Sequence, residues 1–333
     1  MKRPSKLGTK LSIHKSQQGF ALLTVLMIVA LVAMIGSQLI YEQYTHIKRS
    51  SNMLHQAQSF SVAWGLESWV KEGLEKDAQN NQSDHLNELW ADSFGPIPYE
   101  GGELTGQLID LQGRLNLNNL LEADAAKLKH WQNIVQRYAE QQGLPIGFSD
   151  LVTDWVDQND QALPLGAESN NYLLKQPAYS AANQAIVMLS ELKQIEGLQR
   201  LPFKQWQVLQ QDLTALPKVV LVNVNTAEPR VLEALAVWFT PAVTKRWLQQ
   251  REKAPAKTRG EFRQFIVDET GFPLADVLKD LPDWVISVQT DYFLLQGQVD
   301  FGESQQTISA IFHRQTNKQV RLVQRWLSVT DTL

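Results

Sequence analysis

Apolar and charged positions separate sharply near the start of the chain. Residues 20–40 carry no charged side chain, whereas the residues before them carry five basic side chains and no acidic one. At a rise of 1.5 Å per residue, a helix over this segment is about 31 Å long, which matches the hydrocarbon core of a bilayer. The pattern predicts a transmembrane helix whose basic end stays in the cytoplasm, so that the rest of the chain is exported.

The helical pattern continues beyond this apolar segment. Residues 41–77 contain no proline, and apolar side chains recur on one side at a spacing of three or four. We therefore expect a spine helix over residues 41–78 that packs on a globular domain through this stripe. The stripe consists of Met53, Ala57, Phe60, Trp64, Leu66, Val70 and Leu74.

Residues 79–119 predict the first β portion of that domain. Pro96, Pro98, Gly101 and Gly102 predict a loop, and the alternation over residues 108–112 predicts strand pairing. Three β-rich runs in residues 286–333 predict an antiparallel meander, with breaks at Gly302 and at residues 316–318. The expected strands cover residues 291–299, 306–314 and 319–329.

Between these β portions, residues 120–285 are mostly helical in pattern. A helical block between two β portions indicates an insertion into a single α+β domain. Glycine and proline signals separate the expected helices. These helices cover residues 123–141, 180–191, 203–211, 229–239 and 241–251.

Composition limits the classes of function. The chain has 333 residues and no cysteine, so it contains neither a disulfide nor a thiolate metal site. The part that we expect to be exported holds 26 basic and 35 acidic residues, a net charge of −9. Such a surface repels nucleic acid and favours divalent cations or basic partners. The six histidines are scattered and form no zinc-binding or catalytic motif, so we expect no enzyme activity.

The junction at Gly19 and Phe20 distinguishes this chain from an ordinary secreted precursor. A signal peptide is cleaved after its apolar core, but here the Gly-Phe pair comes before it. This arrangement resembles a type IV prepilin leader. The resemblance implies that a prepilin peptidase removes residues 1–19 and that the new amine of Phe20 is methylated. An uncleaved signal anchor is the alternative.

Two asparagine-rich motifs precede expected helices, at residues 112–120 and 222–232. We expect Asn118 or Asn119 to cap the helix that begins near Leu120, and Thr226 to act similarly before Pro229. The earlier asparagines are suited to pair buried loop backbone. With the order of the elements, these motifs make the whole chain resemble the minor pseudopilins of the K family in the bacterial type II secretion system.

The resemblance implies a type IV pilin-like fold with a large inserted all-α, SAM-like domain. It also implies an inner-membrane protein with a periplasmic C-terminal domain at the tip of a pseudopilus. The implied partners are the I- and J-type minor pseudopilins, the major pseudopilin and the prepilin peptidase. Thr24 takes the place of the glutamate found at the fifth mature residue of most pilin-like subunits, as is characteristic of the K family. A minor pilin of a type IV pilus or of a DNA-uptake system is the alternative. Because the exported part is acidic, we expect no nucleic-acid partner.

An acidic cluster between residues 154 and 172 is a candidate metal site. Hard cations bind six to eight oxygen atoms, which carboxylates and amides from two neighbouring loop segments can supply. In the K family the matching stretch resembles a calcium site. Carried over by position, that resemblance implies a structural calcium ion, and a solvated acidic turn is the alternative. The implied ligands are Asp157, Asp160, Glu168 and Asn171, with Asn159 as a further candidate.

Overall fold

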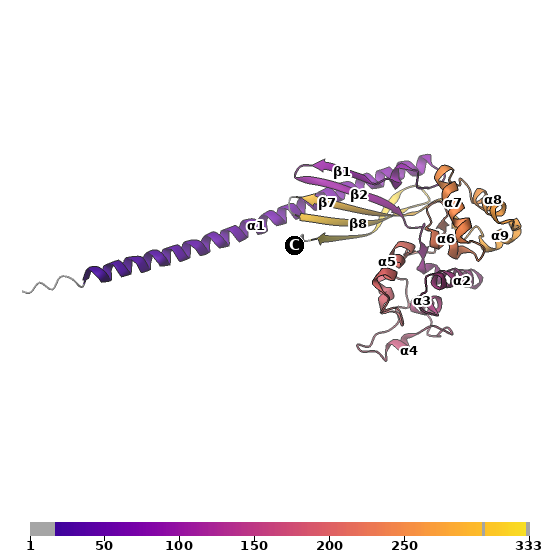
Figure 1. Ribbon diagram of the computed structural model, residues 1–333, viewed down its shortest axis with the longest axis horizontal. Helices are drawn as coiled ribbons and strands as arrows, with labels where there is room; N and C mark the ends of the chain where they lie inside the picture. Colours follow the sequence, from indigo (N-terminus) through magenta and orange to yellow (C-terminus); the bar gives the residue numbers. More distant parts are fainter. Residues whose placement is uncertain (1–16, 302–303, 331–333) are drawn as a thin grey trace, which may run out of the picture. The chain divides into compact units, whose positions relative to one another are not determined.

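The computed structural model describes residues 17–301 and 304–330. Residues 1–16 of the predicted leader and the predicted break at Gly302 lie outside the described residues. The chain divides after Phe60 into two compact parts, which are described separately. A 64-residue helix, α1 (Gln17–Asn80), contributes to both (Figure 1).

The part of α1 before residue 61 carries the apolar segment. This segment makes the helix long and apolar enough to cross a membrane, and no side chain in its most apolar stretch is buried. The hydroxyl of Thr24 donates to the carbonyl oxygen of Ala21 at 2.9 Å. Because this bond pairs the only polar group of the Thr24 side chain within the helix, the residue is compatible with lipid.

A five-stranded antiparallel sheet forms the β layer of residues 61–333, in the order β1-β2-β7-β8-β9. Two of its members, β1 (Phe94–Tyr99) and β2 (Gly102–Asp110), precede the helical block in sequence. β7 (Tyr292–Phe301), β8 (Ser304–Arg314) and β9 (Val320–Thr330) follow it and form the predicted meander. The sheet is therefore completed by two segments that are far apart in the sequence (Figure 1).

The alternation of side chains along β7 gives the sheet two packed faces. Phe293 and Leu295 pack with Leu66, Val70 and Leu74 of α1 in one cluster. Tyr292 and Leu294 face the opposite way and pack with Leu216 and Val220. Successive side chains of a strand point to opposite faces, so one strand joins α1 to the helical block.

The predicted stripe on α1 is only partly correct. Leu66, Val70 and Leu74 are buried, and so is Ala63, which the prediction omitted, whereas Met53 is 68% and Trp64 is 55% exposed. The buried positions follow the 3.6-residue period, and Trp64 lies off their face.

The prediction of a loop around Pro96 and Pro98 is wrong, because these residues lie in β1. In the described part of the chain, β1 pairs with β2 on one side and has no strand on the other. Proline lacks a backbone N–H, and an edge strand tolerates this loss because half of its backbone groups need no partner strand.

Beyond α1 and the large sheet, the described residues contain eight α-helices, three 3₁₀ turns and two pairs of short parallel strands. The helices are α2 (Ala125–Gln141), α3 (Phe148–Val156), α4 (Ser169–Tyr172), α5 (Phe203–Asp212), α6 (Pro229–Leu235), α7 (Pro241–Lys253), α8 (Arg259–Thr270) and α9 (Leu274–Asp280). The 3₁₀ turns are η1 (Leu89–Ala91), η2 (Leu117–Leu121) and η3 (Leu189–Gln194). β3 (Leu115–Asn116) pairs with β4 (Leu213–Thr214), and β5 (Val222–Asn223) pairs with β6 (Ile286–Ser287).

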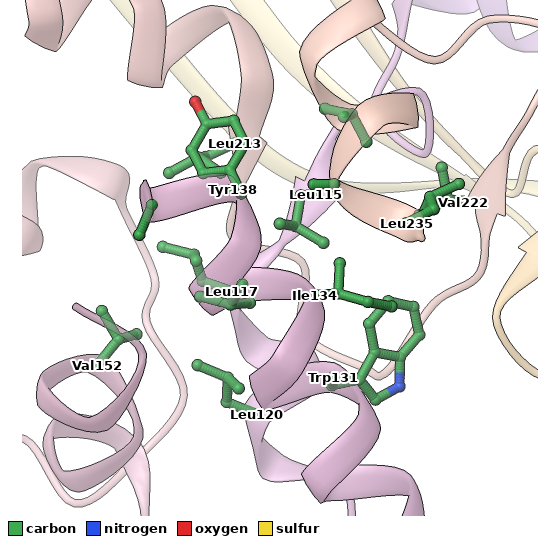
Figure 2. Packing of buried hydrophobic residues seen from close by; sticks show 14 of the residues in the cluster. Leu115, Leu117, Leu120, Trp131, Ile134, Tyr138, Val152, Leu213, Val222 and Leu235 are labelled. Carbon is green, nitrogen blue, oxygen red and sulfur yellow. The ribbon is translucent and has the colours of Figure 1, made fainter. Parts of the chain in front are cut away.

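One apolar core holds the helical block together. Figure 2 shows Trp131, Ile134 and Tyr138 of α2 around Leu115 and Leu117, and all five side chains are fully or almost fully buried. The Tyr138 hydroxyl donates to Asp212 at 2.8 Å, so the polar end of this ring is paired inside the core.

The predicted helix over residues 180–191 is wrong, because only the turn η3 forms at its end. Asn118 explains the difference. Its side chain accepts from the amide of Ile186 and donates to the carbonyl of the same residue, both at 2.9 Å. These bonds occupy the backbone groups that a helix would use, and residues 181–188 form neither helix nor strand.

The asparagines of the first motif pair loop backbone, as predicted, but neither Asn118 nor Asn119 caps a long helix. Asn116 caps the short turn η2 instead, and Asn119 accepts from and donates to the backbone of Val220 at 2.9 and 2.8 Å. The cap of α2 is Asp124, whose carboxylate accepts from two amides of the first turn.

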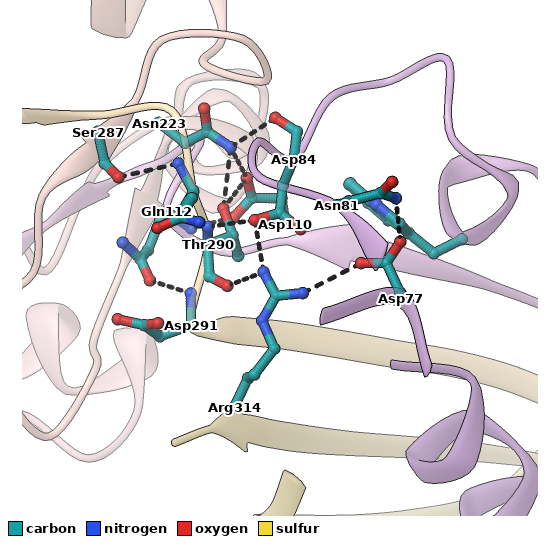
Figure 3. A network of polar contacts seen from close by, with 12 residues as sticks. Asp77, Asn81, Asp84, Asp110, Gln112, Asn223, Ser287, Thr290, Asp291 and Arg314 are labelled. Carbon is teal, nitrogen blue, oxygen red and sulfur yellow. Dashed lines mark hydrogen bonds and ion pairs between the residues drawn. The ribbon is translucent and has the colours of Figure 1, made fainter. Parts of the chain in front are cut away.

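The second motif joins the sheet to the block. The Asn223 side chain donates to Asp110 Oδ2 at 2.9 Å and to Thr290 Oγ1 at 2.9 Å (Figure 3). Thr226 also donates to Asp110 Oδ2, at 2.5 Å, so it does not cap α6 as predicted. Burial raises the pKa of Asp110 to about 6, against the opposing effect of hydrogen bonds from the Thr226 and Thr290 hydroxyls and the Gln112 amide. Pro229 begins α6, as expected.

Candidate metal site

Three carboxylates meet between the end of α3 and the start of α4. Asp154 and Asp157 lie three residues apart at the C-terminal end of α3, and Glu168 directly precedes α4. One oxygen from each lies within 4.8 Å of one from each of the others. Helical residues three apart share a face, so α3 presents two carboxylates to the chain that returns past Gly166.

Glu168 is the most unusual of the three. It is 2% exposed, and neither of its carboxylate oxygens has a hydrogen-bond partner among the residues that the structure describes. Burial, followed by repulsion from Asp154, Asp157 and Asp160, raises its pKa from 4.5 to about 7. A buried carboxylate without donors is costly unless it is protonated or binds a cation.

Asp154 is held in place by the returning loop. Its carboxylate accepts from the amide of Leu163 at 3.1 Å, and the residue is fully buried. Burial raises its pKa from 3.8 to about 6. A Cβ at position 166 would lie 1.9 Å from Asp154 Oδ2, so only glycine leaves room for the carboxylate there.

The structure brings two of the predicted ligands, Asp157 and Glu168, together. Asp160 is exposed and outside the group, although its charge contributes to the raised pKa of Glu168. Asn159 and Asn171 are also exposed. The Asn159 side chain accepts from the amide of Gln161, and the backbone amide of Asn171 donates to the backbone carbonyl of Glu168.

The sequence prediction omitted Asp154 as a candidate ligand. The spacing of Asp154 and Asp157 could have identified it, since both fall on one face of a helix. Its burial could not be predicted from the acidic composition of the stretch. Asp154, Asp157 and Glu168 offer oxygen ligands alone, which suit Ca²⁺ or Mg²⁺ rather than a soft transition metal.

Gly19 and Phe20, the predicted processing residues, lie at the start of α1. Phe20 is 73% exposed, and Gly19 lies in the same helix.

Comparisons with known proteins identify the family. Sequence models described as type II secretion system protein K match residues 113–218 and 222–276. The type II secretion system protein K of Pseudomonas aeruginosa is 30% identical over 94% of this chain and 93% of its own length. The chain belongs to the type II secretion system protein K family. It is a minor pseudopilin of that system, and the matches do not favour the alternative of a DNA-uptake pilin.

Two further matches agree with this assignment. Protein K of Aeromonas hydrophila is 26% identical over 93% of this chain and 97% of its own. A chain from the crystal structure of the GspK-GspI-GspJ complex of enterotoxigenic Escherichia coli has a TM-score of 0.70 at 24% identity. The match covers 85% of this chain and 100% of that one, and it confirms the predicted α+β, pilin-like fold.

Proposed function

We propose that this protein K assembles with I- and J-type minor pseudopilins and caps the tip of the pseudopilus. The observation that carries the proposal is the 30% identity with the Pseudomonas aeruginosa protein K along nearly the whole chain. The related Escherichia coli chain, which shares this fold, was crystallised as a complex of GspK with GspI and GspJ. In this role the protein works by binding other subunits and catalyses no reaction.

The exposed face of α1 supports helix-to-helix assembly. Trp64 is 55% exposed and lies in the part of α1 that packs on the sheet. Exposed tryptophans are uncommon on a surface that meets only water and are enriched at the centres of interfaces. We assign this face to the partner pseudopilins. The helical block adds bulk that suits a terminal subunit better than a repeating one.

The anchor segment fits the same role. In our proposal, prepilin peptidase cleaves between Gly19 and Phe20, and residues 20–40 hold the protein in the inner membrane with its globular part in the periplasm. Thr24 has no charge to offer the amine of a neighbouring subunit. A subunit of this kind can contact the major pseudopilin below it without stacking repeatedly.

We propose further that Asp154, Asp157 and Glu168 bind a structural calcium ion. The unpaired, buried carboxylate of Glu168 supports this assignment. Asp160, Asn159 and Asn171 lie close in sequence and can add oxygen ligands directly or through water. The ion would tie the end of α3 to the start of α4.

Co-purification tests the assembly. Full-length protein in detergent should retain tagged I- and J-type subunits from the same bacterium, and Edman sequencing of the retained protein should begin at Phe20. A protein K that starts at Met1 or fails to retain either subunit would contradict the proposed role.

A further inference from the structure

A second group of carboxylates lies where α1 ends. Asp77 is in the last turn of α1, and Asp84 and Glu88 follow in the segment that leads to the sheet. One oxygen from each lies within 4.8 Å of one from each of the others. The C-terminal end of a helix is itself negative, so three acidic groups there require a compensating cation.

Arg314 at the end of β8 compensates only part of this charge. Its Nη1 donates to Asp77 Oδ2 at 3.1 Å, and its Nη2 donates to Asp84 Oδ2 (Figure 3). The amide of Thr290 also donates to Asp84 Oδ2, at 2.7 Å. One guanidinium against three ionised carboxylates leaves a formal charge of −2.

Glu88 is also held by donors to one of its two carboxylate oxygens. Its Oε2 accepts from Trp90 Nε1 at 2.6 Å and from the amide of His85 at 3.1 Å. Each of the three carboxylates therefore has one oxygen held by a guanidinium, an indole or a backbone amide. None of these donors reaches the second oxygen of the same carboxylate.

The second oxygens of the three carboxylates share a single donor between them. Asp84 is 2% exposed, and its Oδ1 has no hydrogen-bond partner in the described part of the chain. Asp77 Oδ1 and Glu88 Oε1 share a single donor, Asn81 Nδ2, at 2.6 and 2.5 Å. The amide group thus stands between two carboxylates, in the place that a cation would take. Rotating that amide by 180° presents its oxygen instead.

We propose that Asp77, Asp84 and Glu88, with the side-chain oxygen of Asn81, form a second site for a divalent cation of the calcium type. All four ligands are oxygens, as Ca²⁺ requires, and a charge of +2 balances the cluster. A cavity of about 360 Å³ borders Asn81, Asp84 and Arg314 and has room for water ligands. The ion would join the last turn of α1 to the segment that leads from it to the sheet.

The electrostatics of the cluster agree with this assignment. Burial, followed by repulsion from Asp84, raises the pKa of Asp77, and burial raises that of Glu88. Without an ion, the cluster is relieved by protonation of one carboxyl group. The proposal is independent of the site at Glu168, because the two groups share no residue.

Equilibrium dialysis with radioactive calcium can count the ions on the full-length protein in detergent. We expect Glu168→Gln to retain one bound ion and the double variant Glu168→Gln, Asp84→Asn to retain none at the same free calcium. Equal binding by these two variants, or no binding by Glu168→Gln up to millimolar calcium, would overturn the proposal. The wild type should bind one ion more than Glu168→Gln. This difference tests the calcium site proposed at Asp154, Asp157 and Glu168 and does not bear on the second site.

A spectroscopic readout separates ion binding from a purely structural role. Terbium bound beside Trp90 should emit on excitation of the indole, and calcium should compete for the site. Glu88→Gln should abolish this emission in the Glu168→Gln background, while Asp92→Asn, which changes an exposed carboxylate nearby, should leave it intact. Circular dichroism verifies that each variant is folded. Emission that persists in Glu88→Gln would contradict the proposal. Because this experiment does not use Asp84→Asn, it decides the question even if that variant does not fold.

Discussion

Gly166 and Asp154 are in direct steric contact: a Cβ on the glycine would lie 1.9 Å from Asp154 Oδ2. The close approach lets the loop after α3 bring Glu168 to the same carboxylate. The shape of the candidate metal site therefore depends on a residue that offers no ligand.

Gly166→Ala should displace the Asp154 carboxylate and weaken both stability and calcium binding. Overpacking of this kind costs about 1–3 kcal/mol. The midpoint of thermal unfolding should fall, and the increase produced by calcium should shrink. Gly260→Ala is the matched control, since its Cβ would meet nothing closer than 3.6 Å within α8. Equal effects of the two substitutions would show that Gly166 has no special steric role.

The metal-free protein should lose stability as the pH rises from about 4 to about 7. In this range Glu168 and Asp154 hold protons more tightly in the folded chain, with pKa values raised to about 7 and about 6, than in the unfolded chain. Deprotonation then favours unfolding. Calcium requires the deprotonated groups, so its stabilising effect should be larger at pH 7.5 than at pH 5.

Urea unfolding in chelator and in calcium measures this dependence. Asp110 also has a raised pKa and contributes to the pH dependence of stability. The comparison of the wild type with Glu168→Gln separates the contribution of Glu168 from that of Asp110. The substituted protein should show a flatter pH profile and a smaller calcium effect. Parallel profiles for the two proteins would argue against Glu168 as the titrating group.

Asn223→Ala should strongly destabilise the globular part. The substitution removes the donor to Asp110, Thr290 and the backbone of Asp84, all of them buried. A buried group that loses its partner costs about 1–3 kcal/mol, so the loss in the free energy of unfolding should be at least about 2 kcal/mol. The exposed Asn133 on α2 provides the control, and Asn133→Ala should change stability by less than about 0.5 kcal/mol.

Trp64→Ala should weaken assembly without unfolding the protein. The side chain is 55% exposed, so little core packing is lost, whereas a tryptophan at the centre of an interface contributes about 2 kcal/mol or more. Affinity for the I- and J-type subunits should fall about 30-fold or more. Val237→Ala, an 82% exposed position after α6, should have no effect. If both variants bind the partners as the wild type does, the exposed face of α1 is not the interface.

Thr24→Glu tests why this subunit stays at a tip. A carboxylate at this position gives the helix a partner for the terminal amine of an adjacent subunit, which offsets its cost in lipid. Site-specific cross-linking in cells should then detect the variant along filaments as well as at their ends. Thr24→Ser keeps the hydroxyl and should behave as the wild type. An unchanged distribution of Thr24→Glu would remove charge as the explanation.

The most regular parts of the fold could be predicted from sequence. α1 begins with a long uncharged apolar run and contains no proline, and β7, β8 and β9 were predicted from their β-rich composition, so local pattern and final structure agree. β1 was missed because its prolines mark a loop in any sequence reading, and only its place at the sheet edge makes them acceptable.

The rest depends on contacts between distant residues. The segment around Ile186 has a helical pattern, but Asn118, 68 residues away, binds its backbone and no helix forms there. At the candidate metal site, sequence indicated Asp157 and Glu168, while the burial of Asp154 depends on the loop that returns over it. The carboxylates at the end of α1 were missed because Arg314, which orients two of them, is more than 200 residues away.

The prolines of β1 have a consequence for how subunits can join. At two of its six positions the outer strand has no N–H to donate, so a foreign strand cannot form a regular ladder there. Strand exchange and fibril-like growth are therefore disfavoured at the edge of the sheet that β1 forms. Attachment of a neighbour along β1 must then rely on side chains, whose shape and charge can distinguish one sister subunit from another.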